Sequence, residues 1–279
     1  MLIWHPYQKL WNKPFLRFLK KAIPNDYLRG KLTVGIIFTD SFLLSLRKTA
    51  RAIKRKKKYS SLAKMTHVQV NYFDVGTHKK GREISNMVDK LLDKNNLNYD
   101  VYAFEASPSM YIEAKNALKS YPKVSVVNIA LCAEIPEGRV IRLYKTEGGL
   151  GNSVFGADSQ DYEEAPAARL SEFIRKKNIN LKNSVNILRM NIEGAEFGVL
   201  KDLVENDIHK YFNGLYGMWD DLEKMPDSEQ EAVKKLLREN NISPFTFNGR
   251  DLRFPQRLKL IIGDIKSAIL MGPLDKGCQ

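Results

Sequence analysis

The stretch YFDVGTHKKG, residues 72–81, decides the fold of this chain of 279 residues. Its apolar start and the D-V-G that follows are typical of a buried strand that runs into a tight glycine turn, and the residues after Gly81 favour a helix. Such a turn suits a nucleotide or nucleoside, because backbone N–H groups converge there and glycine lets a ligand come close. The spacing of the turn residues then distinguishes the kinds of ligand.

Three kinds of ligand-binding loop can be compared with this spacing. A dinucleotide loop needs G-x-G-x-x-G, but His78 stands at its second glycine. Gly76 and Gly81 have the G-x-x-x-x-G spacing of a P-loop, but the Lys and the Ser or Thr that must follow are missing. The third kind is the S-adenosylmethionine loop of Rossmann-like methyltransferases, and D-V-G at 74–76 fits it. An ordinary strand-to-helix turn is the alternative, because short glycine motifs often arise by chance.

The composition is that of a folded protein with few cysteines. A hydrophobic content of 43% suits one packed α/β domain with an extension. Cys132 and Cys278 lie far apart without C-x-x-C spacing, which indicates neither a disulfide framework nor a zinc site and fits a reducing, cytoplasmic compartment. The four histidines never occur at metal-ligand spacing, so we predict no metal site.

The net charge of +13 is concentrated at one end of the chain. Residues 1–65 contain 16 Lys and Arg against 2 Asp and Glu, whereas residues 66–279 are close to neutral. A catalytic domain that binds RNA usually carries basic residues around its own cleft. The distribution therefore disfavours a nucleic-acid partner and predicts two parts, a basic amphipathic extension at 1–65 and a catalytic domain at 66–279.

The extension has the pattern of a helical segment at a membrane surface. Residues 1–24 interleave aromatic and basic side chains, and the apolar run at 32–46 is shorter than the ~20 residues needed to span a bilayer. Residues 47–58 are almost wholly cationic, and each such residue near an anionic leaflet contributes about 1 kcal/mol. We expect peripheral binding of residues 1–58 to a cytoplasmic membrane face. The alternatives are packing on the catalytic domain, with a solvated cationic run, and nuclear targeting or nucleic-acid binding.

From Val68 onward, apolar runs of strand length alternate with segments of helical period, which predicts an α/β fold with a mostly parallel sheet. The expected strands are 68–75, 99–106, 124–131, 185–192, 212–219, 242–248 and 267–272, a seven-stranded sheet, with a hairpin strand at 140–145. The expected helices are 81–94, 108–118, 168–177, 195–204 and 229–238.

Ligands of open α/β sheets bind beyond the carboxyl ends of the strands, so polar residues there are the candidates for the site. Those at the expected strand ends are Asp74, Glu105, Asn128, Asn191, Glu193 and Asp220. Glu105 lies about thirty residues after the glycine turn on the neighbouring strand, where a carboxylate can accept both ribose hydroxyls. Alternatively, it could stabilise the dipole of the helix that follows Pro108.

Four blocks in order, FDVGTHKKG (73–81), YAFEASP (102–108), VNIALCAEIPEG (127–138) and LRMNIEGAEFGVLKDL (188–203), resemble the FkbM family of S-adenosylmethionine-dependent O-methyltransferases. The resemblance covers residues 68–220. It implies a Rossmann-like class I methyltransferase fold with helices on both faces, S-adenosylmethionine as donor, and transfer to a hydroxyl, often of a sugar or a polyketide. The positions that it assigns to the cofactor are Asp74, Gly76, Thr77, Gly81, Glu105, Ala106, Ser107, Asn128 and Ala130.

The chain departs from the family pattern at the expected catalytic position. Asn191 stands where the family usually has aspartate, and an amide can orient a hydroxyl but cannot take its proton. We therefore expect Glu193, and after it Asp220, to act as general base, and Glu196 to cap the helix behind it. The favoured function is an O-methyltransferase for a hydroxyl-bearing acceptor, a glycan or glycolipid. A non-catalytic cofactor-binding scaffold and an RNA methyltransferase are the alternatives, and the sequence leaves the oligomeric state open.

Overall fold

The computed structural model describes residues 67–78, 80–145, 152–153, 161–192, 195–217, 227–242, 245–246 and 254–272. The chain divides into two units, residues 1–59 and 60–279, and every described residue belongs to the second. The predictions for residues 1–65, including their helical character, lie outside the described residues and stay predictions. No described helix has the length and apolar character needed to cross a membrane.

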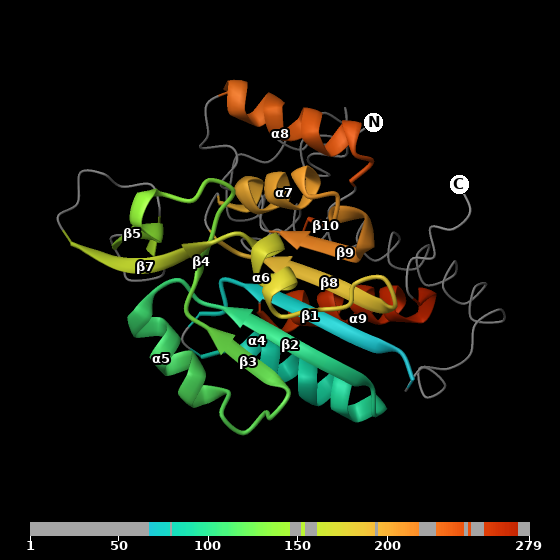
Figure 1. The fold of residues 1–279 in the computed structure, drawn as a ribbon. Coiled ribbons are helices and arrows are strands. Elements are labelled where there is room, and N and C mark those ends of the chain that lie inside the picture. The colour runs from blue at the N-terminus through green and yellow to red at the C-terminus, as the bar shows by residue number, and fades with distance from the viewer. Residues whose placement is uncertain are drawn as a thin grey trace, which may run out of the picture. The chain divides into compact units, whose positions relative to one another are not determined.

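The main sheet has six described strands, all parallel, in the order β10-β9-β8-β1-β2-β3 (Figure 1). The strands are β1 (Gln69–Val75), β2 (Asn98–Phe104), β3 (Val124–Val127), β8 (Ser184–Met190), β9 (Phe212–Gly217) and β10 (Phe245–Thr246). The order reverses between β1 and β8, and this switch point is where open α/β sheets bind ligands. The expected α/β Rossmann-like fold is confirmed, although a seventh strand is not among the described residues.

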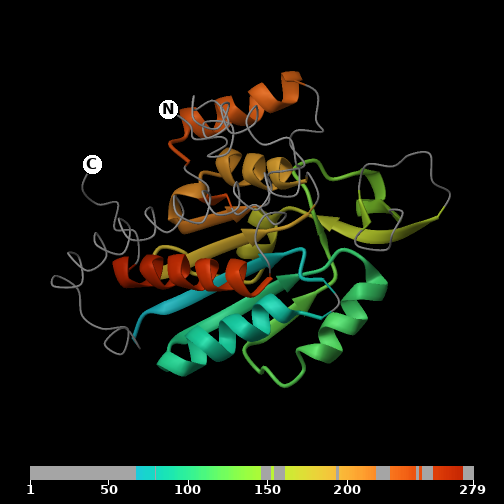
Figure 2. The same ribbon diagram turned by 180° about the vertical axis from the view of Figure 1, so that it is seen from behind.

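Helices cover both faces of this sheet. Figure 2 shows α4 (Arg82–Met87) and α9 (Phe254–Met271) on one face, where α9 also contacts α4, β8 and β9. On the opposite face lie α6 (Leu170–Lys176) and α7 (Glu196–Glu205), in front of the sheet in Figure 1. The chain also forms α5 (Pro108–Ala117) after β2 and α8 (Asp227–Glu239) after β9.

The alternation of side chains along the strands explains why two helical layers are needed. Val70 and Tyr72 of β1 are buried in the cluster that includes side chains of α4 and α9. The intervening Phe73 stacks on Tyr102 of β2, with ring centroids 5.2 Å apart, and Tyr102 meets Phe173 of α6 at 5.6 Å. Both faces of β1 are thus apolar, as expected for a central strand of a parallel sheet.

The expected strand at 124–131 is divided in the structure. After β3 the chain leaves the main sheet and continues as β4 (Ala130–Leu131) in a second sheet of order β4-β7-β5-β6. The other strands of that sheet are β7 (Tyr162–Ala168), β5 (Val140–Lys145), which confirms the expected hairpin strand, and β6 (Asn152–Ser153). Where the chain leaves β3, the side-chain amide of Asn128 donates to the carbonyls of Glu105 and Ala106.

Two further expected elements differ from those observed. The strand predicted at 267–272 is wrong, since these residues belong largely to α9, where Ile265, Ala268 and Ile269 recur at helical spacing and are buried. A short apolar run fits a strand or a buried helix equally well. The helix predicted at 81–94 is α4 only as far as Met87, and continues as a π-helical turn (Val88–Leu92) and a short 3-10 turn.

Candidate active site

The glycine turn is held between the ends of β2 and β8. The N–H groups of Gly76 and Thr77 both donate to the carbonyl of Phe104, over 2.9 and 3.1 Å. Gly76 has a φ of 82°, and a Cβ at this position would lie 2.0 Å from the carbonyl oxygen of Asn191. Only glycine fits here, because the backbone of Asn191 occupies the space that a Cβ would need.

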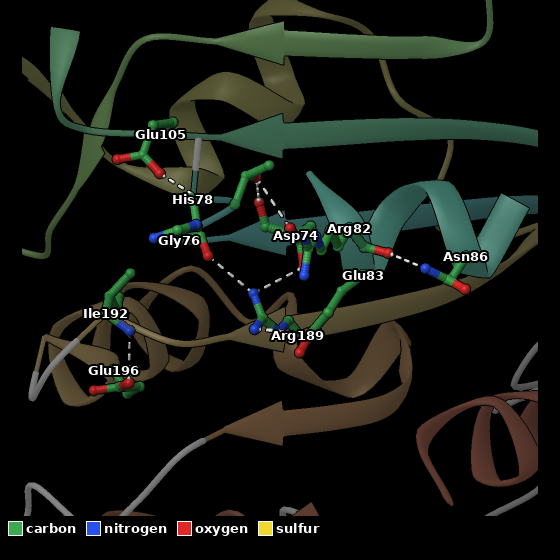
Figure 3. A network of polar contacts seen from close by, with 11 residues as sticks. Asp74, Gly76, His78, Arg82, Glu83, Asn86, Glu105, Arg189, Ile192 and Glu196 are labelled. Carbon is green, nitrogen blue, oxygen red and sulfur yellow. Dashed lines mark hydrogen bonds and ion pairs between the residues drawn. The ribbon is translucent and has the colours of Figure 1, made fainter. Parts of the chain in front are cut away.

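Glu105 follows β2, and its buried carboxylate turns back toward this loop (Figure 3). One oxygen accepts the N–H of His78 at 2.7 Å, and the other accepts the N–H of Ser107 at 3.1 Å. A carboxylate has about four acceptor sites, so each oxygen can accept one further hydrogen bond. Burial raises the pKa of Glu105, while the two N–H groups oppose that shift. The arrangement is suited to two vicinal hydroxyls.

Asp74, at the end of β1, lies beneath the turn and points away from solvent. Its carboxylate is 1% exposed, accepts the Thr77 hydroxyl at 3.0 Å, and forms an ion pair of 3.1 Å with Arg189. The second terminal nitrogen of Arg189 lies 2.6 Å from Glu83 of α4, and the first also donates to the carbonyl of Gly76 at 2.9 Å. Asp74 therefore fixes the turn from below (Figure 3), and its direct contact with a cofactor stays a prediction.

One guanidinium serves two carboxylates in this buried network. Burial raises the pKa of Asp74, and Arg189 opposes the shift. The pKa of Arg189 is itself raised, because Glu83 and Asp74 outweigh the effect of burial. The arginine thus stays charged, and its charge favours the ionised form of Asp74.

Arg189 is the functional residue that the sequence analysis missed. It is the second-last residue of β8, whose seven residues are all buried. A cation inside a strand with no other charged residue was the available signal, since arginine is almost never fully buried unless it is paired. Its partners come from two other elements, which no local pattern in the sequence reveals.

The other positions assigned to the cofactor shape the rim of the site. Ser107 is the N-cap of α5, where its hydroxyl accepts the N–H of Met110 at 3.3 Å and also bonds Glu163 of β7. Ala130 is buried in β4. Gly81 has a φ of 51°, and a Cβ there would lie 2.7 Å from the side chain of Leu118, so packing accounts for this glycine. Their contacts with a cofactor stay predictions.

The structure describes one of the three expected catalytic residues. Asn191 directly follows β8, and its N–H donates to the carbonyl of Val75 at 2.9 Å, which places it beside the glycine turn at the carboxyl edge of the sheet. Glu193 and Asp220 lie outside the described residues. Glu196 is buried in the first turn of α7, and its carboxylate accepts the N–H of Ile192 at 2.9 Å, in keeping with the expected role at the helix start.

Comparison with known proteins gives one match. The family model described as the Methyltransferase FkbM domain matches residues 74–225, more than half of the chain. The matched residues begin at Asp74 and include the glycine turn, Glu105, Arg189 and Asn191. No curated protein and no solved structure matches the chain.

Proposed function

Because this chain belongs to the FkbM methyltransferase family, we propose that it transfers a methyl group from S-adenosylmethionine to a hydroxyl oxygen of a sugar. The acceptor in this proposal is a glycan or glycolipid, presented at an anionic membrane face to which the basic residues 1–58 bind. Methyl transfer follows from family membership, whereas the donor, the oxygen acceptor and the membrane are parts of the proposal.

The observation that carries the choice of donor is the hydrogen bond between the glycine turn and Glu105. It brings together the glycine turn, at His78, and a buried carboxylate with acceptor capacity for two hydroxyls. These features fit the two ends of S-adenosylmethionine, with its amino-acid part over the turn and its ribose hydroxyls on Glu105. The loop lacks the lysine with which a P-loop would bind a nucleoside triphosphate.

When bound, the donor supplies a methyl group on a positively charged sulfur. The work of the protein is then to align the acceptor oxygen with that methyl group and to exclude water. A sugar hydroxyl is a weak nucleophile, so a carboxylate within hydrogen-bond reach assists by removing its proton. We propose Glu193 for this role, with Asp220 as the second candidate. Asn191 would orient the hydroxyl through its amide.

The proposed membrane recruitment is supported by the charge distribution of the chain. The excess of basic residues lies within residues 1–65, and the rest of the chain is close to neutral. Such a segment binds an anionic surface through many weak contacts, each of about 1 kcal/mol. The protein would then reach a glycolipid acceptor at the membrane surface in which that lipid is embedded.

The test begins with calorimetric titration of the full chain with S-adenosylmethionine and with S-adenosylhomocysteine, its demethylated product. We expect both to bind at one site per chain, and NAD and ATP, as matched adenosine ligands with phosphates, not to displace them from it. Transfer is then assayed with labelled donor on glycan and glycolipid acceptors, with and without anionic vesicles. A folded protein that binds neither donor nor product would overturn the proposal.

Asn191 is the observation that favours a second candidate, a scaffold that binds the cofactor without turnover. Its amide cannot accept a proton where the family usually has aspartate. This candidate expects donor binding without methyl transfer to any acceptor, and gain of transfer on Asn191→Asp. Transfer by the unaltered chain would eliminate it.

A further inference from the structure

A solvent-open depression of about 610 Å³ lies beside α6, and none of the residues assigned to the methyl donor lines it. It is formed by two segments that are far apart in the sequence, α6 with the residue before it, and the segment that joins β4 to β5. The lining consists of one apolar, four cationic and one acidic residue: Ile135, Arg139, Arg169, Arg175, Lys176 and Glu172. Its net charge is therefore +3.

The single carboxylate of the lining is already paired. Glu172 binds Arg139 across the depression at 2.6 Å, and this contact lowers the pKa of Glu172. Among the described residues, no carboxylate forms an ion pair with the other three cations, Arg169, Arg175 and Lys176. Three positive charges thus line one concave surface without an acidic partner. The nearby carboxylate of Glu172 is paired with the fourth cation, Arg139.

Two of the arginines are held in place by their surroundings. The Nε of Arg169 donates to the carbonyl of Ala133 at 2.7 Å, which fixes the plane of its guanidinium. Arg139 follows Gly138, and both residues have a positive φ, 56° and 77°. This conformation is unfavourable for arginine, by roughly 1–2 kcal/mol, and it directs the side chain onto α6. A cation held as Arg169 is loses less conformational entropy when an anion binds.

We propose that this depression binds a phosphate-bearing ligand. Guanidinium groups match phosphate oxygens in paired hydrogen bonds, and three cations that lack acidic partners balance a group with more than one negative charge. The volume is within the range of roughly 300–1,000 Å³ found for small-molecule sites. The phosphate belongs either to a soluble phosphorylated saccharide or to a lipid headgroup. The inference concerns a second site and holds whether or not the chain methylates a sugar.

Titration of the full chain with inorganic pyrophosphate at low ionic strength tests the site. The double variant Arg175→Glu/Lys176→Glu reverses two charges and changes the lining from +3 to −1, and we expect it to bind pyrophosphate at least tenfold more weakly. Both side chains are exposed, so the fold should be retained, which circular dichroism checks. The neutral variant Arg175→Gln/Lys176→Gln, with a lining of +1, should be intermediate. Lys94→Glu/Lys119→Glu alters two exposed lysines outside the depression by the same total charge and is the matched control.

The source of the phosphate is distinguished with vesicles of phosphatidylglycerol, compared with phosphatidylcholine. All variants carry the same residues 1–58, so any difference between the double variant and its control reports on the depression. Loss of pyrophosphate binding with unchanged vesicle binding indicates a soluble ligand, and a specific loss of vesicle binding indicates a headgroup. If the chain binds neither probe, or if the double variant and the control bind both equally, the proposal is wrong.

Discussion

Arg189 and Asp74 are register partners on the neighbouring strands β8 and β1, and their side chains form a buried ion pair of 3.1 Å directly beneath the glycine turn. The same guanidinium binds the turn through the carbonyl of Gly76 and the helix α4 through Glu83. Four segments of the chain, β1, the turn, α4 and β8, thus depend on one cation. Removing one partner of such a buried network is expected to leave an uncompensated charge.

Arg189→Met should therefore destabilise the fold by about 3–5 kcal/mol. Methionine fills much of the volume but leaves Asp74 and Glu83 buried without a cation. Chemical denaturation monitored by circular dichroism gives the free energy of unfolding. Arg189→Lys keeps the charge, but the lysine side chain cannot reach all the partners of Arg189 at once. Its free energy of unfolding should lie between those of the wild type and Arg189→Met.

A double-mutant cycle with Asp74→Asn separates the ion pair from the packing of the arginine. The loss in the double variant should be smaller than the sum of the single losses, because each single change leaves the other charge unpaired. Additive losses, or an Arg189→Met protein within 1 kcal/mol of wild type, would show that the network does not stabilise the fold.

The residues of the site that the sequence predicted are those that can be recognised from their neighbours in the chain. D-V-G at 74–76 and Glu105 follow strands that were recognisable from their apolar residues, and both lie at the carboxyl edge of the sheet as expected. Arg189 was not predicted, because its partners lie 106 and 115 residues away in the chain and only the parallel register of β1 and β8 brings them together.

The errors in the predicted fold have the same origin. The run at 267–272 is apolar enough for a strand, but its place over β8 and β9 makes it the end of a helix. The strand predicted at 124–131 ends at Val127, and the side chain of the next residue, Asn128, bonds the carbonyls of Glu105 and Ala106 on another segment. In both cases contacts that are distant in sequence decided between two structures that the local pattern allowed equally.

Gly76→Ala should destabilise the fold by more than the conformational penalty alone. The left-handed conformation costs alanine about 1–2 kcal/mol, and the new Cβ would clash with the backbone oxygen of Asn191, 2.0 Å away. Overpacking of this kind typically adds about 1–3 kcal/mol. We also expect loss of S-adenosylmethionine binding, because the turn must shift to relieve the clash. Thermal denaturation and calorimetric titration measure the two effects.

Substitutions at two further glycines are controls for the effect of Gly76→Ala on stability. Gly138 has a φ of 77° with nothing within 4 Å of an added Cβ, so Gly138→Ala should show only the conformational penalty. Gly263 lies within α9 with open space around it, and Gly263→Ala should stabilise the fold by about 0.5–1 kcal/mol. Equal effects of Gly76→Ala and Gly138→Ala would contradict the close approach of Asn191 to the turn.

His78→Asn should stabilise the glycine turn. His78 is exposed and has a φ of 62°, a conformation in which asparagine is better tolerated than most residues. Its contact with Glu105 uses the backbone N–H and is unaffected by the side chain. We expect a gain of several tenths of a kcal/mol, and a loss of about 1–2 kcal/mol for the β-branched His78→Val. A melting temperature higher for valine than for asparagine would be inconsistent with a left-handed residue here.

Glu105→Gln should weaken S-adenosylmethionine binding at neutral pH by at least tenfold, since a hydrogen bond to a charged group contributes about 1.5–3 kcal/mol. The NH2 group of the glutamine would also face the N–H of His78 or Ser107. That N–H would then lose the carboxylate oxygen that accepts its hydrogen bond. Glu113→Gln, on the exposed side of α5, makes the same change where no ligand is expected and should bind like wild type.

The pH dependence of donor binding tests the same carboxylate without a mutation. Burial raises the pKa of Glu105 above its ordinary value near 4.5, so the ionised form that accepts two hydroxyls is complete only at a pH above that raised value. Affinity should be full above the raised pKa of Glu105 and fall as the pH decreases through it, at a higher pH than for an ordinary glutamate. The stability of the fold depends on pH in the opposite direction. Ionising the buried carboxylate of Glu105 costs free energy, so the fold loses stability as the pH rises from 4.5 to the raised pKa. Glu105→Gln should abolish the acid limb of the binding curve, and an acid limb that persists in this variant would assign the titration to another group.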